Sequence, residues 1–225
     1  MRTKGKITEV FSSVQGEGLY FGEEQIFVRF FGCNLKCKFC DTTLYRFAEY
    51  EPEELLRELK LYQNGHRTIS FTGGEPLLQK YFLKAILKLT KKEGYENYLE
   101  TNGILHSALE DVIDYVDIVA MDLKLPSSTG LKDFWHHHRR FLEIASKKEV
   151  FLKMVICRST DEEDIREGLK LIKEVNKALI LVLQPNSYEE AEPMLEKLEF
   201  FKDIAKDNDI TACIIPQLHK KIGLK

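Results

Sequence analysis

The sequence from position 31 to position 41 reads Phe-Gly-Cys-Asn-Leu-Lys-Cys-Lys-Phe-Cys-Asp and places cysteines at 33, 37 and 40. The asparagine and the two lysines between them are too polar for an ordinary core segment. Three thiolates in one loop can bind a single soft centre, and thiolates favour iron–sulfur clusters, zinc or copper(I). Zinc would need a fourth ligand, for example His66 or His219. A cubane iron–sulfur cluster held by three cysteines would leave one iron open for chemistry.

The composition indicates a globular intracellular protein. The chain has 225 residues, of which 44% are hydrophobic, and its 33 basic and 36 acidic residues give a formal net charge of -3. This balance argues against broad nucleic-acid binding, which needs a basic face. No apolar run approaches the ~20 residues that span a bilayer, and the first residues lack the apolar core of a signal peptide. We therefore expect a cytoplasmic protein without membrane or nucleic-acid partners, in which clustered cysteines indicate metal binding or catalysis.

Short apolar runs alternate with helical patterns along the rest of the chain. The runs are typical of strands buried on both faces of a parallel sheet, and they cover residues 26–30, 68–71, 98–100, 118–121, 150–156, 178–183 and 211–215. Helical periodicity covers residues 52–63, 77–92, 161–174 and 188–206. This alternation predicts one α/β domain over residues 1–225, either a partial or complete barrel or, as the alternative, an open doubly wound sheet. We expect the active site at the carboxyl ends of the strands.

The cysteine spacing closely resembles the signature of the radical S-adenosylmethionine (SAM) superfamily. The resemblance implies a partial (β/α)6-type barrel and a 4Fe–4S cluster on Cys33, Cys37 and Cys40, in a loop over residues 31–43. In that superfamily the open iron chelates SAM, and reductive cleavage of SAM gives a 5′-deoxyadenosyl radical. This radical, and no protein side chain, would then abstract hydrogen from the substrate.

A glycine-rich string agrees with this resemblance. Residues 72–76, Thr-Gly-Gly-Glu-Pro, follow a predicted strand. Two glycines let the backbone approach a ligand, and the Glu75 carboxylate can accept a hydrogen bond from an ammonium group. Alone, the string would be more typical of an ordinary turn from a strand to a helix. After the cysteine loop, it resembles the superfamily motif for the amino group of SAM.

Strings in preserved order from position 7 to position 220 resemble the 7-carboxy-7-deazaguanine synthase family. They are F-S-S-V-Q-G-E-G, F-V-R-F-F-G-C-N, C-D-T, T-G-G-E-P, E-T-N-G, K-L-P-S-S and I-I-P-Q-L-H-K. That family converts 6-carboxy-5,6,7,8-tetrahydropterin to 7-carboxy-7-deazaguanine with release of ammonia, on the route to queuosine and archaeosine. The reaction requires the cluster, SAM and Mg2+. The resemblance also implies a homodimer and a flavodoxin- or ferredoxin-type reductant.

Carried over residue by residue, the resemblance implies three sets of ligand-binding residues. The pterin would contact Val14, Gln15, Gly16, Glu17 and Thr72, with Arg29 on its carboxylate. SAM would contact Phe39, Cys40, Asp41, Gly74, Lys124, Ser127 and Gln184. The Thr42 hydroxyl would coordinate Mg2+, which prefers hard oxygen ligands. One departure is Phe39, which stands where the family often has tryptophan.

Independently of the resemblance, Arg29 is a candidate ligand-binding residue, because it lies within an apolar strand beside the cysteine loop. A buried guanidinium needs a partner, and its planar fork suits a substrate carboxylate. A structural ion pair within the protein is the alternative.

Other features are interpreted as structural. His136, His137 and His138 fall in a helical pattern, so we expect them on a helix surface. Cys157 and Cys213 are expected to be small core residues.

Two other functions share part of the pattern. An enzyme that makes a glycyl radical on another protein would have the cysteine loop but not the Gln-Gly-Glu-Gly string. A zinc-stabilised, non-catalytic α/β protein would contain zinc and would have no brown colour.

Overall fold

The computed structural model describes residues 4–40, 45–62, 65–189 and 191–217. Within these residues, one sheet contains nine strands in the order β3-β1-β2-β4-β5-β6-β7-β8-β9. Seven neighbours run parallel, namely β2 (Glu24–Phe30), β4 (Thr68–Gly73), β5 (Glu96–Thr101), β6 (Ile118–Asp122), β7 (Glu149–Ile156), β8 (Ile180–Pro185) and β9 (Thr211–Ile214). At one edge, β1 (Gly5–Val14) is antiparallel to β2, and β3 (Ala48–Tyr50) is antiparallel to β1.

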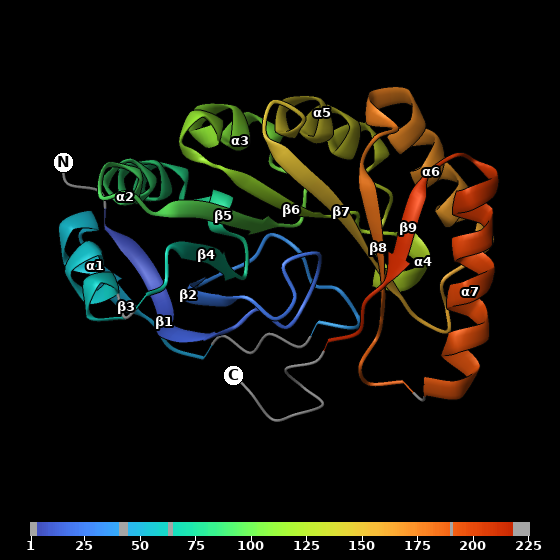
Figure 1. Cartoon of the computed structure of the whole chain (residues 1–225), viewed down its shortest axis with the longest axis horizontal. Coiled ribbons are helices and arrows are strands. Elements are labelled where there is room, and N and C mark those ends of the chain that lie inside the picture. Colours follow the sequence, from blue (N-terminus) through green and yellow to red (C-terminus); the bar gives the residue numbers. More distant parts are fainter. Residues whose placement is uncertain (1–3, 41–44, 63–64, 190, 218–225) are drawn as a thin grey trace.

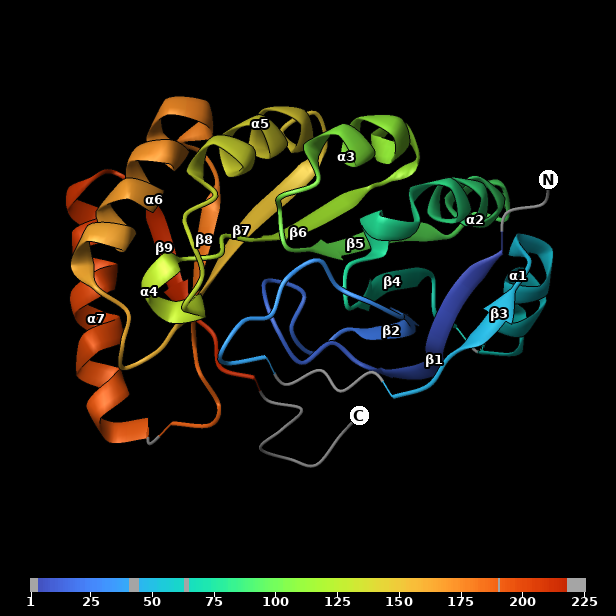
Figure 2. The ribbon, with the colours of Figure 1, turned by 180° about the vertical axis from the view of Figure 1, so that it is seen from behind.

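Helices cover the outer face of the curved sheet and connect its parallel strands (Figures 1 and 2). They are α1 (Pro52–Leu59), α2 (Lys80–Lys92), α3 (His106–Val112), the short α4 (Pro126–Thr129), α5 (Trp135–Ala145), α6 (Glu162–Asn176) and α7 (Ala191–Asp207), with 3-10 turns η1 (Lys60–Tyr62), η2 (Pro76–Gln79) and η3 (Ile113–Tyr115). The edge strands β3 and β9 do not pair with each other, so the barrel stays open. The predicted partial barrel is confirmed. The doubly wound alternative, which needs helices on both faces, is wrong.

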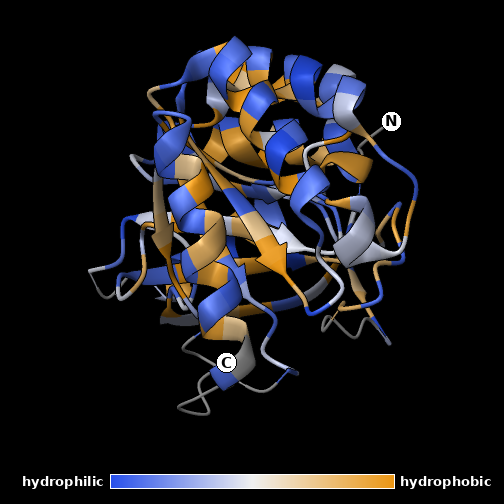
Figure 3. Ribbon diagram, turned by 90° about the vertical axis from the view of Figure 1, so that its right-hand side faces the viewer, coloured by the Kyte–Doolittle hydropathy of each residue, from blue (hydrophilic) through white to orange (hydrophobic). Residues whose placement is uncertain are grey.

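Two apolar clusters stabilise this architecture. The larger lies between the sheet and the helices and includes the fully buried Phe30 and Phe71. The smaller contains Tyr98 and Phe151, and Tyr20 from the loop after β1 packs against it. Figure 3 shows how hydropathy is distributed over the elements. The strands are mainly hydrophobic, whereas the helices carry both hydrophobic and hydrophilic residues. Within the described part of the chain, no helix is long and apolar enough to cross a membrane.

The sequence analysis missed several elements, and β1 and α3 show why. In β1, the buried Gly5 and Ile7 alternate with the more exposed Lys6 and Thr8, a weaker signal than a continuous apolar run. Helix α3 has only seven residues, and its first residues are not capped by a side chain. Short helices without caps give little periodicity to detect.

Candidate active site

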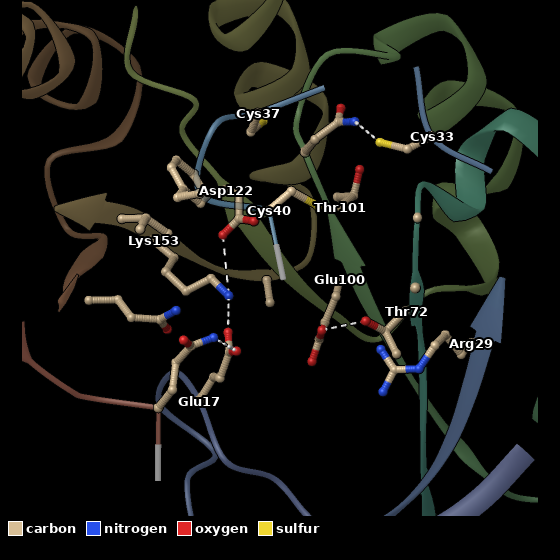
Figure 4. A pocket seen from close by; sticks show the side chains of 18 of the residues that line it. Glu17, Arg29, Cys33, Cys37, Cys40, Thr72, Glu100, Thr101, Asp122 and Lys153 are labelled. Carbon is tan, nitrogen blue, oxygen red and sulfur yellow. Dashed lines mark hydrogen bonds and ion pairs between the residues drawn. The ribbon is translucent and has the colours of Figure 1, made fainter. Parts of the chain in front are cut away.

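A cavity of about 500 Å3 opens at the carboxyl ends of the parallel strands. Its walls come from the turn after β1, the cysteine loop after β2, the ends of β4 to β8 and the segment after β9 (Figure 4). Thirteen sequence-predicted residues line it, namely Val14, Gln15, Gly16, Glu17, Arg29, Cys33, Cys37, Phe39, Cys40, Thr72, Gly74, Lys124 and Gln184. Asp41, Thr42 and His219 lie outside the described residues. The fold therefore gathers segments from across the chain at one edge of the barrel.

Backbone hydrogen bonds hold the cysteine loop, one to its surroundings and one within the loop itself. Lys38 N–H donates to the Thr129 carbonyl at 3.0 Å, and Cys40 N–H donates to the Cys37 carbonyl at 3.1 Å. Burial raises the pKa of the Cys33 and Cys37 thiols, and the nearby Lys124 ammonium acts in the opposite direction. A cation beside these sulfur atoms favours their thiolate forms.

His66 lies at the opposite end of the strands from this loop. Its Nε2 is 3.1 Å from the Ser12 hydroxyl, and its Nδ1 is 3.6 Å from the Glu24 carboxylate at the start of β2. The cysteine loop follows the end of β2, a full strand length away. The hypothesis that His66 is a fourth zinc ligand is therefore wrong.

The Thr-Gly-Gly-Glu-Pro string forms the end of β4 and the start of η2. Gly73 has a φ of +120°, and a Cβ there would lie 2.4 Å from the Phe30 nitrogen, so this position requires glycine. The adjacent Gly74 N–H donates to the Phe30 carbonyl at 3.0 Å. This close approach leaves backbone, without a side chain, on the cavity wall.

Glu75 departs from the expectation that its carboxylate receives an ammonium group from a ligand. The side chain is fully buried and accepts from Leu77 N–H at 3.0 Å, Thr101 hydroxyl at 3.0 Å and Asn102 N–H at 2.8 Å. Burial raises its pKa to about 7, and these hydrogen bonds act in the opposite direction. Glu75 thus ties the end of β4 to the end of β5 and does not face the cavity.

Glu100 on β5 is an acceptor for three polar side chains in the middle of the site. Gln15 Nε2 donates to its Oε1 at 2.8 Å, Thr72 hydroxyl donates to its Oε2 at 2.6 Å, and Ser70 hydroxyl donates to Oε1 at 3.3 Å. The Gln15 Oε1 in turn accepts from Glu17 N–H at 3.1 Å. Glu100 therefore fixes both Thr72 and the turn that carries Gln15.

A row of alternating charges crosses the cavity. Lys124 Nζ lies 2.6 Å from Asp122 Oδ2, and Lys153 Nζ lies 3.3 Å from Asp122 Oδ1. Lys153 also forms an ion pair with Glu17, whose other oxygen accepts from Gln217 Nε2. Figure 4 shows Asp122, Lys153 and Glu17 in one line. The row joins the cysteine side of the cavity to the turn after β1.

Arg29 is only partly buried, with 27% of its side chain exposed, and it contributes to the cavity wall. Its Nε lies 3.5 Å from Glu9 Oε2, and its guanidinium carbon lies 5.5 Å from the centre of the Phe11 ring. The structural ion pair that was the alternative for Arg29 therefore exists. Because the ion pair engages one face of a five-donor group, donors remain for a ligand.

Comparisons with known proteins agree with this geometry. Residues 27–198 match the radical SAM superfamily. The chain is 42% identical over 203 residues to the 7-carboxy-7-deazaguanine synthase of Geobacter sulfurreducens. This match covers 80% of this chain and 81% of that protein. It is 33% identical to the protein of the same name from Methanopyrus kandleri, over 96% of this chain and 92% of that protein. The chain belongs to the 7-carboxy-7-deazaguanine synthase family.

Solved structures with low sequence identity support the fold of this synthase family member. The crystal structure of QueE from Escherichia coli has a TM-score of 0.68 and 21% identity, and the match covers 94% of this chain. A domain of pyruvate-formate lyase-activating enzyme from Bacteroides vulgatus has a TM-score of 0.53 and covers 64% of this chain. The matches to named synthases favour the synthase family over the glycyl-radical alternative.

As a radical SAM enzyme, the synthase family member requires a 4Fe–4S cluster and SAM, and its residues fit that requirement. Cys33, Cys37 and Cys40 supply three soft ligands on the wall of one cavity. Among the described residues, no three His, Cys, Asp or Glu side chains converge on a single metal ion. A cubane differs from such a site because each thiolate binds a separate iron.

Gln184 and Ser127, both expected to contact SAM, have different surroundings. Gln184 is 2% exposed, and its Oε1 has no hydrogen-bond partner among the described residues, so it can accept from a ligand. Ser127 does not contribute to the cavity wall. Its N–H and hydroxyl donate to Asp164 at 2.7 and 2.5 Å, which joins α4 to the start of α6.

The histidine triplet needs a correction. His136 and His137 are exposed on α5, as expected, but His138 is fully buried. Its Nδ1 lies 3.0 Å from the Gly103 carbonyl oxygen, and its Nε2 accepts from Lys124 N–H at 3.1 Å. Burial lowers its pKa to about 4, so the ring is neutral, with the proton on Nδ1. His138 therefore supports two loops of the synthase site.

The sequence analysis missed Lys153, and it gave no role of their own to Glu100, Asp122 and Gln217, although they lie in or beside strings that resemble the family. One signal was present for Lys153, because it is a charged residue within the apolar run of residues 150–156. Asp122 and Glu100 follow or end predicted strands, where site residues were expected. Cys157 is buried and Cys213 is partly buried, in agreement with structural roles.

Proposed function

We propose that this protein converts 6-carboxy-5,6,7,8-tetrahydropterin to 7-carboxy-7-deazaguanine, with release of ammonia. The observation that carries the proposal is that the three cysteines and the Gln15–Glu17 turn line the same cavity. The product is inferred from the names of the relatives. The role of each residue is inferred from the sequence strings that resemble the family.

On the cofactor side, Cys33, Cys37 and Cys40 would hold the cluster. When bound, the reduced cluster and SAM supply the radical chemistry of the reaction. Gly74 would accept SAM against its bare backbone, and Gln184 would give SAM an acceptor through its unpartnered Oε1. Phe39, under the Lys124 ammonium at 5.5 Å, would border the adenine.

On the substrate side, Val14, Gly16 and Gln15 would form the edge of the pterin site. Glu17 would accept from ring N–H groups, and the Arg29 guanidinium would donate to the substrate carboxylate, a charge-assisted pairing of matched geometry. Thr72, which pairs with Arg29 across β2 and β4, would contact the substrate beside it, held there by its bond to Glu100.

Several parts of the proposal depend on the sequence and its family resemblance and not on the described structure. Asp41 would contact SAM and Thr42 would coordinate Mg2+, although both lie outside the described residues. A flavodoxin- or ferredoxin-type protein would supply the electron, and the enzyme would act as a homodimer in the cytoplasm. Ser127 stays a prediction as a SAM ligand, although its two bonds to Asp164 point it elsewhere in this structure.

Anaerobic reconstitution tests the proposal directly. The reconstituted protein is supplied with dithionite, SAM, Mg2+ and 6-carboxytetrahydropterin, and the products are followed by mass spectrometry. We expect 7-carboxy-7-deazaguanine and ammonia from the wild type and neither from Cys37→Ala. Cleavage of SAM with the pterin left intact would retain the superfamily and contradict the proposed substrate.

A further inference from the structure

Lys153 is a buried cation in the middle of an otherwise apolar strand. The residue is 9% exposed, and its neighbours Leu152 and Met154 are fully buried in the cluster between the sheet and the helices. Because side chains alternate along a strand, Lys153 points to the other face, into the cavity. Lysines are almost never buried unless they are paired. The partners of Lys153 therefore indicate its role.

Those partners are two carboxylates from different parts of the site. Lys153 Nζ forms an ion pair with Glu17 in the turn after β1, and lies 3.3 Å from Asp122 Oδ1 at the end of β6. Lys124 occupies the other Asp122 oxygen at 2.6 Å. The two ammoniums and two carboxylates cancel in formal charge, so the row is neutral only while Lys153 is present.

Glu17 keeps acceptor capacity toward the cavity. One of its oxygens faces Lys153 and the other accepts from Gln217 Nε2. A carboxylate has about four lone-pair positions, so about two remain for a ligand. The 2-amino-4-oxo ring of a pterin presents neighbouring N–H groups of the matching polarity.

We propose that Lys153 is a positioning residue, which keeps Glu17 ionised and oriented as an acceptor for the N–H groups of the pterin ring. The inference rests on the proposed function, because it takes the pterin as the donor. Lys153 acts through Glu17 and need not contact the substrate. Selection of the 2-amino-4-oxo ring then depends on a residue of β7 as well as on the turn itself.

The electrostatic surroundings of Glu17 explain why a cation is needed. The groups that face it or its ion pair are Lys153 of β7, Asp122 of β6, Tyr98 and Glu100 of β5, Lys124 after β6 and Gln217 after β9. Burial raises the pKa of Glu17, but the charge and hydrogen bond of Lys153, together with the hydrogen bond from Gln217, leave this pKa below its usual value. Tyr98 stays neutral, because burial holds its pKa well above the usual value.

Without Lys153, burial and the Asp122 carboxylate would raise the pKa of Glu17, and the hydrogen bond from Gln217 would be left to oppose them. The pKa of Glu17 would then rise, so more of its carboxyl groups would be protonated as the pH falls. One of its oxygens would become a donor that faces a donor of the substrate, which is a mismatch in a desolvated site.

The test measures pterin binding to the reconstituted, SAM-loaded enzyme between about pH 6.5 and about pH 9. The wild type and Lys153→Arg should bind with little dependence on pH. Lys153→Met, of similar shape and without charge, should bind about tenfold or more weakly at the acidic end and recover toward wild type at the alkaline end. The matched control is Lys170→Met on α6, whose side chain is 61% exposed and pairs with Glu167 at 3.4 Å. This control should behave as the wild type.

A second variant assigns the titration to Glu17. In Lys153→Met combined with Glu17→Gln, binding should stay weak and lose its pH dependence, because the titrating group is gone. The proposal would be overturned if Lys153→Met bound the pterin more weakly by the same factor at every pH. It would also be overturned if binding by the double variant still depended on pH. Wild-type affinity of Lys153→Met throughout the range would overturn it as well.

Infrared spectroscopy separates failure of this inference from failure of the proposed function. With no substrate present, all variants share the protonated carboxyl band of Glu75, and Lys153→Met should show a further carboxyl band at the acidic end of the range that the wild type and the double variant lack. If the wild type neither binds nor converts the pterin, the proposed function is wrong, and the infrared band still decides whether Lys153 keeps Glu17 ionised. Absence of that band from Lys153→Met would contradict the inference.

Discussion

At position 138, a single imidazole holds two loops of the site together. The ring donates to the Gly103 carbonyl from Nδ1 and accepts from Lys124 N–H at Nε2, so both of its nitrogens are used by backbone groups. The two loops follow β5 and β6, and both border the cavity. His138 thus sets the spacing between two walls of the site from outside it.

Replacing His138 with phenylalanine should weaken both folding and SAM binding. Two buried backbone groups would lose their partner, at about 1–3 kcal/mol each. Urea denaturation and a SAM-binding titration measure the two effects. His136→Phe on the same helix is the control, because His136 is exposed and should change stability by no more than about 0.5 kcal/mol. Equal effects of the two substitutions would contradict the role assigned to His138.

The same ring should make stability depend on pH. The pKa of His138 is about 4 in the folded protein, against 6.5 for the ordinary group, so the unfolded chain binds more protons between these values. Its contribution is complete above about pH 6.5 and is lost as pH falls toward 4, by roughly 3 kcal/mol in total. Urea midpoints measured at several pH values should fall more steeply for the wild type than for His138→Asn. Parallel profiles would show that another group dominates the acid limb.

The sequence predicted the residues that line the cavity better than the residues that hold those walls in place from outside. The cysteines, Gln15, Glu17 and Arg29 lie in strings that carry a chemical pattern of their own. His138 does not, because its partners are 35 and 14 positions away along the chain. Only the folded structure brings such residues together.

At the scale of elements, the loop after β1 packs inside the barrel and also carries a residue of the site. Tyr20 in this loop packs edge-on against Tyr98, with ring centroids 5.5 Å apart, and its hydroxyl donates to Glu149 at the start of β7. The same loop carries Glu17 into the cavity. Packing of the loop inside the barrel therefore determines where Glu17 lies.

Gly18→Ala tests this dependence. A Cβ at Gly18 would lie 2.7 Å from the Phe151 ring, at a φ of +67°, whereas Gly22 in the same loop has a φ of +90° and open space around it. Gly22→Ala adds backbone strain without a clash and is the matched control. We expect Gly18→Ala to raise the KM for the pterin severalfold more than Gly22→Ala, with SAM affinity close to wild type in both. Steady-state kinetics and SAM titration measure this, and similar KM values in the two variants would contradict it.

Periodicity predicted the parallel strands of the barrel but not its first strand. Runs such as residues 68–71 are buried on both faces and therefore nearly continuous in hydrophobicity. Strand β1 at the antiparallel edge has mixed burial, and its pairing with β2 depends on a register that no local pattern contains. The curvature that opens the cavity is likewise a property of the whole sheet.

At the scale of the whole molecule, the two ends of the strands have separate chemistry. The cysteine loop lies at the carboxyl ends, whereas His66 lies beside Ser12 and Glu24 at the amino end of β2. His66→Ala should therefore retain the wild-type iron content and the visible absorption of the reconstituted cluster. Cys37→Ala should lose most of both. Iron and sulfide analysis decides the matter, and a loss of iron in His66→Ala would contradict the separation of the two ends.

The contact between Glu17 and Gln217 joins residues 200 positions apart in the chain. During synthesis on the ribosome, the three cysteines emerge before Gln217, so they are made while this contact is still missing. Until Gln217 emerges, the cavity that the cysteines line lacks one of its wall residues. A chain that stopped before Gln217 would thus contain all three cysteines but would lack part of the cavity that surrounds them.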